Sequence, residues 1–139
     1  MSKQVNRSLE NKAFDRIDHA LGRPVDPLAD TYREYFATDR GSDLAAEFTA
    51  SPHWEEGKGC GDMGYFYVTR TGREALAAHL RDIGDPHRSY VVTYCGYEDT
   101  VAAISHSKAK YSRWLAVSDV DPDLTFKEFC KKCRVRLAA

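Results

Sequence analysis

Four cysteines and five histidines are the side chains of this 139-residue chain that could hold a metal ion. Cys130 and Cys133 enclose two lysines and have the spacing of zinc ligands. His53 and Cys60 could complete a set of three cysteines and one histidine. A strong zinc signature contains two paired ligand sets, however, and this chain has one pair. A zinc site is therefore the weaker of two interpretations.

Burial in a helix is the other interpretation of the cysteine pair. Phe126, Phe129, Cys130 and Cys133 follow one another at i, i+3, i+4 and i+7, which is the spacing of one apolar helix stripe. Free cysteine behaves as a small hydrophobic residue. The pattern therefore favours packed thiols, and we expect neither metal nor cofactor.

Catalytic motifs are missing from the sequence. It contains no G-x-S-x-G elbow and no H-E-x-x-H helix. The glycine-rich run GKGCGDMG is followed by a predicted strand and not by the GK[ST] of a phosphate-binding loop. A cysteine nucleophile needs a nearby base, and the spacing places no histidine beside a cysteine. We therefore expect a non-enzymatic protein.

Three helices come first among the elements that must position these residues. Ser8 is a good cap for a helix over residues 9–21, Pro27 can begin one over 27–37, and Ser42 can cap one that ends at Ala50. Strands are expected at 53–56 and 63–69, joined by EGKGCGD. A further helix is expected within 69–84.

A second module begins after GDPHR. Strands at 89–95 and 100–105 are expected to form a hairpin across GYED. A helix from Ser105 or Ser107 follows, and Thr125 caps a last helix containing FKEFCKKCRV. The expected fold is α+β, with modules at 1–85 and 86–139 packed as one body.

The segment YVTRTGREAL resembles the final strand and following helix of bacterial winged-helix regulators. The resemblance covers residues 9–83 and implies three helices, a β-hairpin and a helix, with the third helix reading DNA. That helix, SDLAAEFTAS, has no arginine, lysine, asparagine or glutamine for base edges. We therefore expect the usual DNA face to serve another partner.

The net charge of the chain is −1, but the charged residues are distributed unevenly along it. Residues 105–139 carry a net charge of +4, which leaves −5 for the rest of the chain. An acidic surface repels nucleic acid and attracts a basic protein. The acidic face expected to bind such a partner consists of Asp39, Asp43, Glu47, Glu55 and Glu56.

Direct binding of DNA or RNA is the alternative function that the basic end of the chain predicts. Lysines and arginines there could contact phosphates, and the run SHSKAK loosely resembles how double-stranded-RNA-binding domains present lysines. Such a protein would be a transcriptional regulator. The basic residues are Lys108, Lys110, Arg113, Lys127, Lys131, Lys132, Arg134 and Arg136.

As a whole the chain resembles small proteins of bacteriophages and prophages, through phrases such as GRPVDPLADTYREYFATDRGSD and SKAKYSRWLAVSDVDPDLTFKEFCKKCRVRLA. The resemblance implies a role in regulation, in nucleic-acid handling or in inhibition of a host defence. We expect the partner to be a host protein or ribonucleoprotein complex, and a homodimer is left open.

Location in the bacterial cytoplasm is expected from two features of the sequence. The longest apolar runs have four or five residues, against about 20 for a membrane span. The start, MSKQVNRSLENK, lacks the apolar stretch of a secretory signal. We therefore expect no contact with a membrane.

Overall fold

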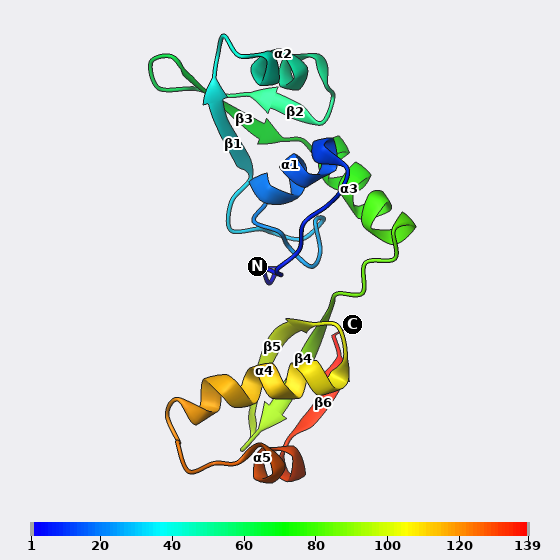
Figure 1. Ribbon diagram of the computed structural model, residues 1–139, viewed down its shortest axis with the longest axis vertical. Coiled ribbons are helices and arrows are strands. Elements are labelled where there is room, and N and C mark those ends of the chain that lie inside the picture. Colours follow the sequence, from blue (N-terminus) through cyan, green and yellow to red (C-terminus); the bar gives the residue numbers. More distant parts are fainter. Residues whose placement is uncertain (1, 139) are drawn as a thin grey trace. The chain divides into compact units, whose positions relative to one another are not determined.

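The computed structural model describes residues 2–138, which form two compact units (Figure 1). The first unit ends at Asp85 and the second begins at Pro86. Within the described residues each unit contains one three-stranded antiparallel sheet together with helices. The predicted α+β fold class is therefore confirmed.

The first unit follows most of the predicted element order. Its helix α2 is capped by the Ser42 hydroxyl, and α3 by that of Thr69, as polar N-caps predict. Helix α1 begins later than expected, because Asn11 and not Ser8 accepts hydrogen bonds from the first free amides. The elements are α1 (Lys12–Ala20), β1 (Tyr35–Asp39), α2 (Asp43–Ala50), β2 (Trp54–Glu56), β3 (Met63–Val68) and α3 (Arg70–Asp82).

The predicted helix over residues 27–37 is wrong. Residues 27–34 have no regular structure, and the strand β1 follows them. The apolar residues that suggested a helix also fit a strand, because Tyr35 and Phe36 alternate between the two faces of the sheet. A helix-turn-helix needs two consecutive helices, whereas α2 alone lies between β1 and β2. The three-helix arrangement implied by the winged-helix resemblance is therefore not present.

The sheet of the first unit has the strand order β1-β3-β2, and one of its faces is buried. Phe36, Phe66, Val68 and Trp54 alternate with exposed or half-buried neighbours along the three strands. They pack with the apolar sides of α1, α2 and α3, and Phe48 stacks on Trp54 at 4.1 Å. The helices therefore cover one face of this sheet and leave the other open.

A buried ion-pair network fixes the N-terminal segment of the first unit. Asp18 on α1 is fully buried and accepts two hydrogen bonds from Arg7, at 2.9 and 2.6 Å. Arg23 adds a third contact at 3.2 Å, and Arg7 also reaches Asp85 at 3.2 Å. The network joins residues that lie far apart in the sequence.

The second unit also places helices on one face of a sheet. Its core contains Tyr90 and Val92 from β4 and Phe129 from α5. The strand order is β5-β4-β6. The elements are β4 (Arg88–Tyr94), β5 (Tyr97–Ala103), α4 (His106–Ser118), α5 (Phe126–Lys132) and β6 (Arg134–Leu137).

The hairpin of β4 and β5 turns two residues earlier than expected. Cys95 and Gly96 form the turn, with φ angles of +52° and +81°. Two positive φ angles in a two-residue loop are typical of a type I′ turn, which matches the twist of the strands. The predicted turn GYED is therefore wrong, and its last three residues lie in β5.

The last helix is shorter than predicted. It ends at Lys132, Cys133 has an extended backbone, and Arg134–Leu137 pairs with the central strand β4. Val135 lies opposite Val92 and packs against the core. Arg134 and Arg136 therefore belong to a strand and not to a basic helix.

Candidate interaction surfaces

Three tyrosines gather on the open face of the first unit's sheet. Tyr35 lies opposite Tyr67 in the register of β1 and β3, and Tyr65 is two residues away from Tyr67 on the same face. The ring of Tyr35 is 5.4 Å from that of Tyr65 and 5.9 Å from that of Tyr67. Tyr35 remains 42% exposed, so the cluster is accessible from solvent.

Two carboxylates and a methionine share this face. Asp39 lies opposite Met63, and Glu55 lies opposite Tyr67. A Cβ atom at position 57 would overlap the Tyr67 ring, so Gly57 allows the ring to lie in its present position. We call this surface the tyrosine face, and it consists of Tyr35, Asp39, Glu55, Met63, Tyr65 and Tyr67.

The five acidic residues predicted as one face are distributed over several surfaces. Only Asp39 and Glu55 lie on the tyrosine face. Asp43 and Glu47 lie on α2, which packs on the other side of the sheet, and Glu47 pairs with Arg16 at 3.2 Å. Glu56 lies opposite the buried Phe66 and therefore points to the core side at an edge strand.

The order of residues in β3 predicts that two of these tyrosines share a face, which composition alone does not show. Alternation in the run Tyr65-Phe66-Tyr67-Val68 places both tyrosines on one face and the buried residues on the other. Tyr35 was missed because its segment was predicted to be a helix, in which its position relative to the sheet is undefined.

The predicted basic residues of the second unit fall into two classes. Arg113 pairs with Asp99 at 3.2 Å, and Arg136 pairs with Glu98 at 3.7 Å. Arg136 reaches over the central strand to do so, because Val91 and Thr93 separate the two residues in the register. Within residues 2–138 no acidic side chain forms an ion pair with the others, which are Lys108, Lys110, Lys127, Lys131, Lys132 and Arg134.

The surroundings of Cys133 and Tyr94 in the second unit shift the pKa values of both side chains. Burial raises the pKa of the Cys133 thiol, and the nearby charge of Lys110 opposes this increase. Burial also raises the pKa of Tyr94, with smaller contributions from Cys95, Asp121 and Glu128.

The four residues of the zinc hypothesis are divided between the two units. Cys60 is exposed in the β2–β3 hairpin, and His53 lies near Phe14 with a ring separation of 6.3 Å. Cys133 is buried at the end of α5, and its thiol faces the Cys130 carbonyl at 3.9 Å. Within the described residues no group of three or more histidine, cysteine or acidic side chains could hold a metal ion.

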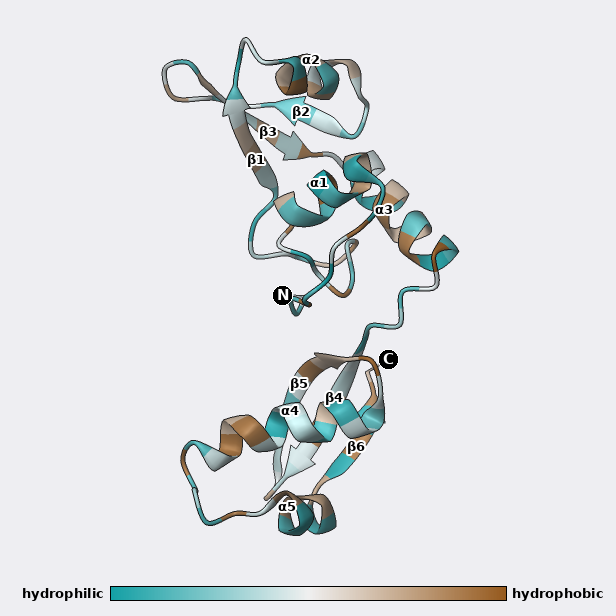
Figure 2. Cartoon of the chain, viewed as in Figure 1, coloured by the Kyte–Doolittle hydropathy of each residue, from teal (hydrophilic) through white to brown (hydrophobic). Residues whose placement is uncertain are grey.

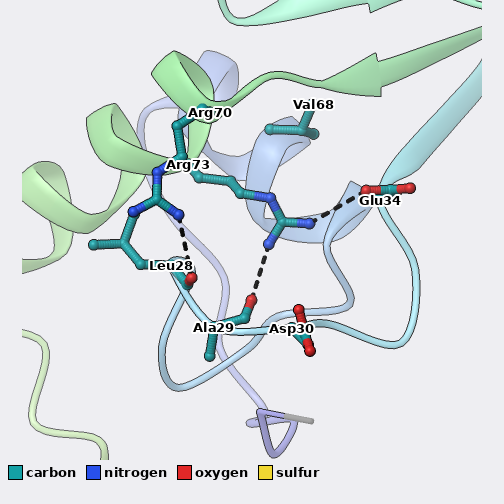
Figure 3. Close-up of a pocket in the computed structure, with 7 residues that line it drawn as sticks. All are labelled: Leu28, Ala29, Asp30, Glu34, Val68, Arg70 and Arg73. Atoms are coloured by element: carbon teal, nitrogen blue, oxygen red, sulfur yellow. Dashed lines mark hydrogen bonds and ion pairs between the residues drawn. The ribbon is translucent and has the colours of Figure 1, made fainter.

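A depression of about 320 Å³ lies at the start of α3 (Figure 3). Arg73 donates to the Ala29 carbonyl at 3.1 Å and pairs with Glu34 at 3.5 Å. Arg70 donates to the Leu28 carbonyl at 3.4 Å. Both guanidinium groups therefore hold the irregular segment 27–34 against α3, and the depression follows from this structural contact.

Hydrophobic residues occupy the C-terminal half of α4 (Figure 2). Tyr111 and Leu115 lie one turn apart on this helix, and each is 46% exposed. The described residues contain nothing that indicates which partner would cover them. The homodimer left open by the sequence stays a prediction.

Comparisons with known families, proteins and structures give no relative of this chain. The chain matches no protein-family model, no curated protein and no solved structure. None of the helices in residues 2–138 is long and apolar enough to cross a bilayer. The resemblances to winged-helix regulators and to phage proteins stay predictions.

Proposed function

We propose that this protein is a non-enzymatic interaction protein that binds a basic protein surface through the tyrosine face. One observation carries the proposal: three neighbouring tyrosines lie on a sheet face that no helix of their unit covers. Tyrosine is enriched among the residues that dominate binding energy at protein interfaces. An aromatic face of this kind favours binding of a protein over catalysis.

Charge favours a basic protein over a nucleic acid as the partner of this face. Asp39 and Glu55 flank the tyrosines, and the chain up to Asp85 carries a net charge of −4. Carboxylates repel phosphates but pair with arginine and lysine, whose cations also stack on tyrosine rings. Rim charges of this kind speed the encounter and orient the partner.

A phage-related protein, as the sequence resemblance implies, would use such a face against its host. The partner would be a host protein or the protein part of a ribonucleoprotein complex. Occupation of a basic groove by the tyrosine face would compete with the nucleic acid that normally binds there. The outcome would be inhibition or regulation of the host complex.

Substitution of the tyrosines tests the proposal. The double variant Tyr35→Ser/Tyr67→Ser should lose capture of its partner from a host lysate, because truncation of interface tyrosines typically costs about 2 kcal/mol each, or roughly thirtyfold in affinity. Tyr97→Ser/Tyr111→Ser is the matched control, since these tyrosines are exposed in the second unit. Equal capture by both variants would contradict the proposal.

Charge reversal separates the tyrosine face from the other acidic residues. Asp39→Lys/Glu55→Lys should slow association with a basic partner, and this difference should shrink as salt is added. Asp43→Lys/Glu47→Lys introduces the same charge on α2 and should have a smaller effect. If the α2 variant has the larger effect, the contact surface lies on the helix side instead.

A further inference from the structure

We infer that the tyrosine face binds an arginine side chain of its partner, with the guanidinium group stacked on the Tyr67 ring and paired with the Glu55 carboxylate. Arginine recognition rests on the proposed function, because it names the group that the basic partner presents to this face. Two features of the surface favour it: the position of the Tyr67 ring, and a carboxylate beside that ring which the chain itself leaves unpaired.

The Tyr67 ring lies over the sheet, between Gly57 and Tyr35. A Cβ atom at position 57 would overlap the Cδ2–Cε2 edge of this ring, so the ring occupies the space above Gly57. On the other side the Tyr35 ring is 5.9 Å away. Tyr67 is half-buried, so part of the ring remains open to solvent. Its neighbours therefore hold the ring in place before a partner binds.

Glu55 lies beside this ring on the same face. It is the register partner of Tyr67, which places the two Cβ atoms about 5 Å apart. Glu55 is exposed, and no cation of residues 2–138 forms an ion pair with its carboxylate. A partner can therefore pair with Glu55 without breaking an existing ion pair.

The rest of the tyrosine face also attracts a cation. Asp39 is a second carboxylate of this face without an ion pair among the described residues. Arg40 follows Asp39 in the chain, but its side chain passes Gly64 on the side of the sheet that the helices cover. No basic side chain belongs to the tyrosine face, so a positive charge must come from the partner.

Arginine fits this ring and carboxylate better than lysine does. A guanidinium group is planar, so it can stack on an aromatic ring and donate two parallel hydrogen bonds to a carboxylate at the same time. A lysine ammonium is a compact, strongly hydrated charge without this planar geometry. Arginine and tyrosine are also enriched among the residues that dominate binding energy at interfaces. A basic partner would therefore anchor on Tyr67 and Glu55 through an arginine.

Titration of the isotope-labelled full-length chain with two peptides of equal length tests arginine recognition. In one peptide glycine alternates with arginine, and in the other with lysine, so both carry the same charge. The arginine peptide should bind about fivefold more tightly, because only its cations stack and form bidentate pairs at once. In NMR spectra it should shift the backbone amide signals of Glu55, Gly57 and Tyr67.

The variant Glu55→Gln should weaken binding of the arginine peptide about fivefold, because it removes the charged acceptor of the bidentate pair. Glu56→Gln is the matched control, since Glu56 is the next residue of the same strand and points to the other side of the sheet. A peptide whose arginines are methylated on both terminal nitrogens keeps its charge and loses the bidentate pair. It should therefore bind equally to the unmodified chain and to Glu55→Gln.

The outcomes separate arginine recognition from the proposed function. Equal affinity for the arginine and lysine peptides, with both weakened by Glu55→Gln, overturns arginine recognition and leaves the proposed function in place. An equal loss in Glu56→Gln also overturns it, because overall charge and not the site would then determine affinity. If neither peptide shifts the amide signals of the tyrosine face, both proposals fail.

Discussion

The two units use the same layer arrangement and leave opposite chemistry on the open face of the sheet. In the first unit that face carries Tyr35, Tyr65 and Tyr67 with carboxylates beside them. In the second unit the corresponding positions of β6 are Arg134 and Arg136, which lie opposite Thr93 and Val91 of β4, and Arg136 pairs with Glu98 of β5. One architecture therefore supports two different kinds of surface.

The two surfaces differ in the outward-facing strand positions, which alternate with the buried ones and are not used for packing. The core-facing residues of both sheets are apolar and aromatic, because they must be buried against helices. The other positions are free to carry any chemistry that the strand tolerates. Aromatic residues there favour a protein partner.

The interiors of the two units also differ. The first unit buries the carboxylate of Asp18 against two arginines. The second is held by an apolar and aromatic core, and its ion pairs at Arg113 and Arg136 lie at the surface. The units should therefore respond differently to mutation and to pH.

The largest effect is expected from Asp18→Ala. It removes the buried carboxylate that Arg7 and Arg23 share, leaves Arg7 with Asp85 as its acidic partner, and should lower the free energy of unfolding of the first unit by about 3–5 kcal/mol. Each unit has one tryptophan, so fluorescence of Trp54 and Trp114 in single-tryptophan variants follows the two units separately in urea. A parallel loss at Trp114 would show that the units unfold together.

Val92→Ala is the counterpart in the second unit. It removes two methyl groups from a side chain that is 1% exposed on the central strand, and should cost about 2–3 kcal/mol from lost burial and the cavity left behind. The urea midpoint should fall for Trp114 and not for Trp54. A larger shift at Trp54 would remove the distinction between the two cores.

Gly57→Ala should disturb the tyrosine face more than the fold. The new methyl group overlaps the Tyr67 ring, which lies on an open surface and can move at a cost of about 1–2 kcal/mol. Partner binding should weaken, because Tyr67 belongs to the tyrosine face. Gly41→Ala is the control, because a Cβ at position 41 meets no other atom within 4 Å.

The smallest effect is expected from pH, and its sign should differ between the units. Burial and nearby arginines lower the pKa of His19, and Arg23 lowers that of Asp15, so both groups favour the folded first unit less as pH falls. The first unit should lose stability below the ordinary histidine pKa and again below that of aspartate.

In the second unit the raised pKa values of Tyr94 and Cys133 reverse the direction. The unfolded chain loses these protons at lower pH than the folded one, so stability should fall as pH rises above about 9. Urea midpoints of the two single-tryptophan variants between acidic and alkaline pH measure both trends. Equal pH dependence in the two units would contradict them.

Local signals in the sequence predicted several elements of the fold. Ser42 and Thr125 each cap the helix for which they were predicted, and Ser105 is one of the two predicted starts of α4. Pairing between strands cannot be read from local spacing, and for that reason residues 27–37 and 134–135 were assigned to helices. Residues 35–37 and 134–135 lie in the edge strands β1 and β6, whose state depends on a partner strand far away in the sequence.

Composition and spacing by themselves determined the α+β class, the caps of α2 and α5 and the opposite charges of the two ends, because these depend on near neighbours in the chain. Tertiary structure alone decided that Asp18 is buried, that Tyr35 joins Tyr65 and Tyr67, and that Lys131 lacks an acidic partner among residues 2–138. The physical reason is the same in each case. A surface or an ion pair is made by residues that only strand register and helix packing bring together.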